Sequence, residues 1–125
     1  MLKAKSGTIV NVGSMSGFIV NKPQEQCFYN ASKAAVHHLT KSLAAEWAAR
    51  GVRVNAVAPT YIETPLNRDF FATEAGQALI RRIPQRRLGQ LADLDAPLRL
   101  LCSDEARYMT GSSIVVDGGH LCSSL

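Results

Sequence analysis

The sequence lacks the features that mark membrane, secreted and metal-binding proteins. Its 125 residues contain no run of the roughly 18 apolar residues that a membrane span needs, and the first residues carry no apolar core of a secretion signal. We therefore expect a cytoplasmic location and no membrane partner. The three cysteines are far apart and form no C-x-x-C pair, so we expect reduced thiols and no metal site.

Aromatic residues are missing where a nucleic-acid-binding surface would need them. The formal net charge of +4 comes partly from four neighbouring arginines, Arg81, Arg82, Arg86 and Arg87. Such a cluster could bind phosphate groups. No aromatic side chains are interleaved with it to stack on bases. We therefore predict a solvated surface and no nucleic-acid partner.

What the sequence does contain is an alternation of strand and helix patterns. Short apolar runs predict strands over residues 8–12, 52–58 and 113–116. Helical patterns cover about 27–49, 66–71, 74–83 and 91–102. Gly51 ends the long helix, and Pro97 weakens the first turns of the last one. Continuous apolar strands separated by helices predict an α/β fold with a parallel sheet covered on both faces.

The long helix carries an apolar stripe that should pack on the sheet. The stripe consists of Val36, Leu39, Leu43 and Trp47. His37 and His38 are adjacent on this helix and cannot both face one metal, so we predict core or surface roles for them.

Tyr29 and Lys33 form the first candidate for chemistry. They stand four residues apart near the start of the long helix, so their side chains leave the same face one turn apart. A free phenol, with a pKa near 10, exchanges protons poorly at neutral pH, and a nearby ammonium favours the phenolate. Strand 8–12 delivers Gly13 and Ser14 to its carboxyl end, where ligands bind in open α/β sheets. The spacing is therefore typical of a proton donor in hydride transfer, although it is also common on solvated helices.

Four motifs in order resemble the short-chain dehydrogenase/reductase family. They are I-V-N-V-G-S-M-S-G at 9–17, Y-N-A-S-K-A at 29–34, R-V-N-A-V-A-P at 53–59, and T-G at 110–111 with V-D-G-G at 116–119. The resemblance runs from about residue 7 to residue 119. It implies the C-terminal half of a Rossmann-like doubly wound parallel sheet, with three strands and flanking helices.

The same resemblance implies roles for the polar residues of these motifs. Tyr29 would be the general acid/base, and Lys33 would favour its phenolate and hydrogen-bond the nicotinamide ribose. A serine would hold the substrate oxygen, and two serines compete for this role. Ser14 fits the pattern N-x-x-S-x-x-G, whereas Ser16 lies thirteen residues before the tyrosine, a spacing common in the family. We favour Ser14, because the loop between the serine and the tyrosine varies in length more readily than the turn at the strand end.

The resemblance also implies an NAD or NADP cofactor. The segment after the second strand would bind the nicotinamide carboxamide, and its candidate residues are Pro59, Thr60, Ile62 and Thr64. Thr60 stands where the family usually has glycine. Glycine permits backbone conformations that threonine resists, so this departure affects how closely the backbone can approach the cofactor. The family's turn T-G-x-x-x-G-x-G, which binds the pyrophosphate, is absent. We therefore expect residues 1–125 to be the C-terminal part of a single domain, a fragment without the N-terminal dinucleotide-binding half.

The implied function is an oxidoreductase that interconverts a secondary alcohol and a ketone with NAD(P). The stretches around the serines and Tyr29 are most similar to polyol and sugar dehydrogenases, with substrates like mannitol, sorbose or threitol. A 3-oxoacyl-thioester reductase is the alternative substrate class. An alternative of another class is a truncated, catalytically silent chain that acts only in assembly, since family members commonly form homotetramers.

Overall fold

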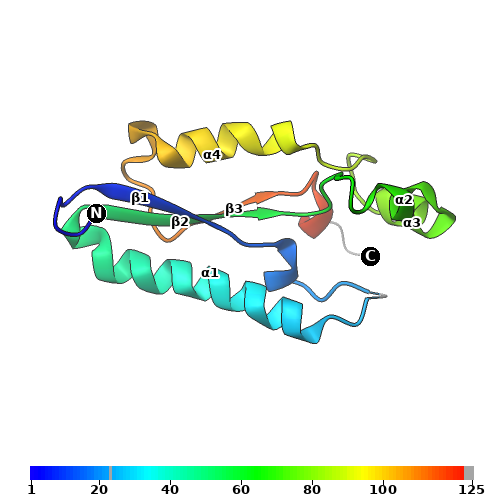
Figure 1. Cartoon of the computed structure of the whole chain (residues 1–125), viewed down its shortest axis with the longest axis horizontal. Helices are drawn as coiled ribbons and strands as arrows, with labels where there is room; N and C mark the ends of the chain where they lie inside the picture. The colour runs from blue at the N-terminus through cyan, green and yellow to red at the C-terminus, as the bar shows by residue number, and fades with distance from the viewer. Residues whose placement is uncertain (23, 123–125) are drawn as a thin grey trace.

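The computed structural model describes residues 1–22 and 24–122. Within this part of the chain, three parallel strands form one sheet in the order β1 (Gly7–Val12), β2 (Val52–Pro59), β3 (Ser113–Val116). Helix α1 (Cys27–Trp47) covers one face of the sheet and α4 (Asp95–Cys102) covers the other (Figure 1). The predicted α/β class with a parallel sheet is confirmed.

Strand β2 lies at the centre of the sheet and forms the core. Its residues from Val52 to Ala58 are buried except Arg53, as an apolar run covered on both faces should be. Arg53 donates hydrogen bonds to the carbonyl oxygens of Leu101 and Ser103, which lie at the end of α4. The strand thereby holds one covering helix through a side chain as well as through packing.

Helix α1 packs on the sheet through part of the predicted stripe and through polar residues beside it. Its buried residues are His37, Thr40 and Ala44. Leu43 and Trp47 pack against the core as predicted, but Leu39 is 50% exposed, so its predicted core position is wrong. Thr40 can be buried because its hydroxyl donates to the carbonyl of Val36 and accepts from the amide of Asn11.

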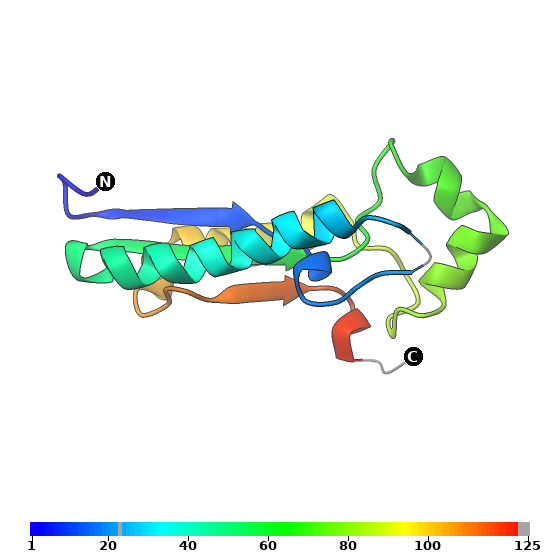
Figure 2. The same ribbon diagram turned by 90° about the horizontal axis from the view of Figure 1, so that it is seen from below.

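The remaining elements lie around these layers. Short helices α2 (Arg68–Ala72) and α3 (Glu74–Ile80) lie beyond the carboxyl ends of the strands (Figure 2). The described residues also form short 3₁₀ helices, namely η1 (Met15–Gly17), η2 (Ala48–Arg50), η3 (Leu91–Leu94), η4 (Asp104–Ala106) and η5 (His120–Cys122). The predicted helix over 91–102 is therefore a 3₁₀ turn followed by α4, whose first turn accommodates Pro97.

Gly51 ends α1 and η2 as predicted. Its φ of +75° lies in the left-handed region that glycine adopts without strain. No helix in the described part of the chain is long and apolar enough to cross a membrane.

Candidate active site

The turn that follows β1 carries both candidate serines. Gly13 donates its N–H to the carbonyl of Val57 at 2.8 Å, which extends the sheet ladder to the start of the turn. Ser14 is extended, and its Oγ accepts from the N–H of Ser16 at 3.1 Å. The Oγ of Ser16 in turn accepts from the amide of Asn21 at 3.2 Å. Each hydroxyl therefore accepts one hydrogen bond and retains its own O–H for another acceptor.

Lys33 connects Tyr29 to the end of β1. The Nζ atom of Lys33 lies 5.6 Å from the centre of the Tyr29 ring and donates to the carbonyl of Val12 at 3.1 Å. Tyr29 itself is 37% exposed. The predicted placement of the two side chains on one helix face is observed.

Gly17 allows the serine turn to sit directly on α1. A Cβ atom added to Gly17 would lie 2.8 Å from the carbonyl oxygen of Lys33 and 2.4 Å from Cδ2 of His37. Both distances are shorter than any van der Waals contact, so a larger residue would push the turn away from the helix. The glycine that closes the sequence motif therefore brings the serines close to the backbone of Lys33.

Thr60 fits its position at the end of β2. Its N–H donates to the carbonyl of Val116 at 3.2 Å, and its hydroxyl donates to the sulfur of Met15 at 2.8 Å. In the described part of the chain Thr60 is not among the residues with positive φ, so its backbone needs no glycine. The segment that begins at Pro59 is thereby tied to the serine turn, although the two are 45 residues apart.

Asn67 holds the rest of that segment and was not predicted from the sequence. Its amide nitrogen donates to the carbonyl of Ile62 at 2.8 Å, and its amide oxygen accepts from the N–H of Thr64 at 2.9 Å. The predicted helix began at about residue 66 and so included Asn67, whereas α2 begins at Arg68 with Asn67 in the N-cap position, which asparagine favours. The hydroxyl of Thr64 makes no hydrogen bond within the described residues. Its donor and acceptor capacity is therefore not used by the described residues.

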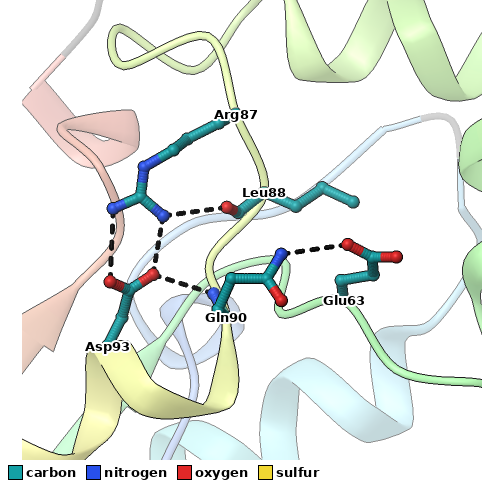
Figure 3. Close-up of polar contacts among 5 residues, drawn as sticks. All are labelled: Glu63, Arg87, Leu88, Gln90 and Asp93. Carbon is teal, nitrogen blue, oxygen red and sulfur yellow. Dashed lines mark hydrogen bonds and ion pairs between the residues drawn. The ribbon is translucent and has the colours of Figure 1, made fainter.

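A charged network contacts the same segment through Glu63 (Figure 3). Arg87 forms a two-pronged ion pair with Asp93, with N to O distances of 2.6 and 3.3 Å. Gln90 joins the two ends of the network: its N–H donates to Asp93 at 2.8 Å, and its side-chain amide donates to Glu63 at 2.9 Å. We call Glu63, Arg87, Gln90 and Asp93 the 63–93 network. One of the four arginines predicted to be solvated is thus engaged in an ion pair.

The network shifts the titration of both its carboxyl groups. The hydrogen bond from Gln90, followed by that from Arg68, lowers the pKa of Glu63. The hydrogen bond from Arg87, followed by that from the backbone of Gln90, lowers the pKa of Asp93. Both groups therefore remain ionised at neutral pH and keep their hydrogen bonds.

Tyr61 is a second tyrosine near the site, but its surroundings suit a structural role. Its ring packs against those of Phe71 and His120, with centres 5.6 and 5.7 Å apart. Burial raises the pKa of Tyr61, and the charge of Arg82 opposes the rise. A phenol held in its protonated form is a poor proton acceptor, so these surroundings do not favour an acid/base role for Tyr61.

His37 also contacts the serine turn, while its neighbour does not. His37 is 5% exposed, whereas His38 is exposed, which agrees with the predicted core or surface roles. No group of three or more potential metal ligands occurs in residues 1–22 and 24–122. The three cysteines are free thiols, as expected.

Comparison with known proteins decides the family. A family profile described as Enoyl-(Acyl carrier protein) reductase matches residues 1–120. The chain is 52% identical over 126 residues to galactitol 2-dehydrogenase of Rhizobium johnstonii, and the match covers 98% of this chain. A solved short-chain type dehydrogenase/reductase from Mycobacterium marinum is 43% identical with a TM-score of 0.88 over 98% of this chain. The chain belongs to the short-chain dehydrogenase/reductase family.

A further similar structure was solved with ligands. It is a gluconate 5-dehydrogenase from Burkholderia cenocepacia in complex with NADP and tartrate, 32% identical with a TM-score of 0.91 over 98% of this chain. The implied Rossmann-like short-chain dehydrogenase/reductase fold is thereby confirmed. The chain spans about half the length of these relatives, 48% in each of the three cases.

Proposed function

We propose that the protein containing these residues is an NAD(P)-dependent oxidoreductase that interconverts a secondary alcohol and a ketone in a polyol or sugar. The observation that carries the proposal is the position of Lys33, which contacts both the Tyr29 ring and the carboxyl end of β1, where the Ser14 turn begins. The similarity to galactitol 2-dehydrogenase supports the substrate class.

In the proposed reaction, the chain's own residues hold the substrate oxygen and move its proton. Ser14 donates its O–H to that oxygen, and Tyr29 accepts the hydroxyl proton during oxidation or returns it during reduction. The ammonium of Lys33 stabilises the phenolate that exists between these transfers. Bound NAD(P) supplies the hydride acceptor or donor, so that loss of a proton and a hydride converts the alcohol to the ketone.

The proposed cofactor contacts lie on α1 and on the segment after β2. Tyr29 and Lys33 would lie against the nicotinamide ribose, while Pro59, Thr60, Ile62 and Thr64 would hold the carboxamide. The sequence contains no T-G-x-x-x-G-x-G turn. We therefore assign the pyrophosphate site to a dinucleotide-binding half outside these residues, in the same single domain. The proposal includes a homotetrameric full-length enzyme located in the cytoplasm.

A substrate panel tests this function in the full-length protein. We expect NADH or NADPH to form when galactitol, mannitol or arabinitol is supplied with the oxidised cofactor, and to be consumed with the matching ketoses. Activity confined to 3-oxoacyl thioesters would favour the alternative substrate class. Absence of turnover with both panels would contradict the proposed function.

A further inference from the structure

His37 is buried between the serine turn and the start of β3. Its Nε2 atom lies 3.0 Å from the carbonyl oxygen of Ser14, and its Nδ1 atom lies 2.9 Å from the hydroxyl of Ser113. The ring of Phe18 stacks on it, with centres 4.3 Å apart. One side chain thus joins α1, β3 and the turn that carries the candidate serine.

Both neutral forms of the His37 ring hold the Ser14 peptide. With the proton on Nε2, the ring donates to the Ser14 carbonyl and accepts from the Ser113 hydroxyl. With the proton on Nδ1, the ring donates to Ser113, and Nε2 accepts from the N–H of Ser14 at 3.4 Å. The 3.0 Å contact favours the first form. In either form the ring is bonded to the backbone of Ser14 itself.

The turn is shaped around this ring. A Cβ atom on Gly13 would lie 2.3 Å from Cε1 of His37, and one on Gly17 would lie 2.4 Å from Cδ2. The two glycines on either side of Ser14 therefore leave room for an imidazole. A shorter side chain at position 37 would leave the Ser14 peptide without its partner.

We propose that His37 is a positioning residue, which orients Ser14 toward the substrate oxygen by holding the peptide from which its side chain departs. The inference rests on the proposed function, in which Ser14 donates to that oxygen. Its consequence is kinetic, because a misplacement of about 1 Å in a catalytic group can cost on the order of 100-fold in rate. His37 itself touches neither substrate nor cofactor in this role.

Two amide substitutions separate positioning from packing in the full-length enzyme. In His37→Gln the side-chain amide nitrogen takes the place of Nε2 and can still donate to the Ser14 carbonyl. In His37→Asn the amide reaches only as far as Nδ1 and retains Ser113 alone. We expect kcat to fall about tenfold or more in His37→Asn and to be largely rescued in His37→Gln, with the KM for NAD(P) nearly unchanged in both. His38→Asn, the same change at the exposed neighbour, serves as the matched control.

A double-mutant cycle with Ser14→Ala provides the decisive measurement. If His37 acts through the Ser14 hydroxyl, His37→Asn should lower kcat little further in the Ser14→Ala background. An equal fall in both backgrounds would show a general structural role and overturn the inference, as would unchanged kcat in His37→Asn. If Ser14→Ala alone leaves kcat intact, the proposed role of Ser14 fails and the inference fails with it.

Ser113→Ala keeps the test decisive if His37→Asn does not fold. This change removes only the hydroxyl that fixes Nδ1 and leaves the ring in place. We expect a smaller fall in kcat than for His37→Asn, and one that disappears in the Ser14→Ala background. A fall of the same size in both backgrounds, or no fall, would contradict the positioning role.

Discussion

At the scale of single residues, Tyr29 is the group whose removal should affect chemistry and little else. Tyr29→Phe deletes the phenol oxygen but keeps the ring near Lys33. We expect kcat of the full-length enzyme to fall by about 10²–10⁴-fold, the usual contribution of general acid/base catalysis, while NAD(P) affinity changes little. Steady-state kinetics with a cofactor-binding titration measures both. Retention of most of the activity would refute the acid/base assignment.

Lys33 has two roles in the proposed reaction, so its loss should show in two parameters. Lys33→Ala removes the ammonium beside Tyr29 and the hydrogen bond to the carbonyl of Val12. We expect both a lower kcat and a weaker affinity for NAD(P), measured by the same kinetics and titration. If thermal stability alone changes, the contacts of Lys33 are structural.

The two serines are separable by kinetics because only a hydroxyl aimed at the reacting oxygen stabilises the transition state. We expect Ser14→Ala to lower kcat by about 10²–10³-fold, as the loss of an oxyanion-type donor does. Ser16→Ala should have a modest effect, since in the proposed reaction it is the hydroxyl of Ser14, not that of Ser16, that donates to the substrate oxygen. The reverse ranking would show that the spacing to Tyr29 outweighs the turn motif.

At the scale of elements, the 63–93 network joins the segment after β2 to η3, and its strength should depend on pH. The pKa of Asp93 is lower in the folded protein than the ordinary value near 3.9. Its contribution to stability is therefore complete above that value and is lost as pH falls through the lowered pKa. We expect Asp93→Asn to lower the melting temperature of the full-length protein at about pH 7 and to have no effect at a pH low enough to protonate Asp93.

A matched variant controls for the loss of one surface charge. Glu105→Gln changes an exposed carboxylate that makes no ion pair among the described residues. It should leave the melting temperature almost unchanged at both pH values. An effect of Asp93→Asn that is equal at both pH values would contradict an electrostatic role for the network.

Sequence patterns predicted those elements whose signals are local. The apolar run at 113–116 matches the bounds of β3, and the long helix was predicted to begin at Cys27, where α1 begins. The patterns could not predict the hydrogen bonds of His37, because its partners Ser14 and Ser113 are 23 and 76 residues away. Leu39 was wrongly placed for a related reason: the buried face of α1 contains the polar residues His37 and Thr40, which only their distant partners make tolerable.

At the scale of the whole molecule, the described chain exposes more surface than a compact monomer. Its accessible surface is 7999 Å², against about 6,500 Å² expected for a monomer of this mass. Large apolar side chains contribute to the excess, among them Phe28 on α1 and Leu66 before α2, which are 76% and 97% exposed. Strand β1 pairs only with β2 in the described residues, so its outer edge presents unpaired backbone groups.

The last prediction concerns the 125-residue chain purified by itself. Its open β1 edge and exposed apolar side chains should drive self-association, because each contact formed removes apolar surface from water and pairs backbone groups. Tyr29, Lys33 and Thr64 could contact only the nicotinamide end of a cofactor, and binding energy from the remote pyrophosphate and adenine is what positions the reacting ring. We therefore expect concentration-dependent association in sedimentation experiments and no detectable NAD(P)-dependent oxidation of polyols. A monodisperse preparation that unfolds cooperatively and binds NAD(P) at about micromolar concentration would contradict this, since its binding free energy of about −8 kcal/mol would then have to come from the nicotinamide end alone.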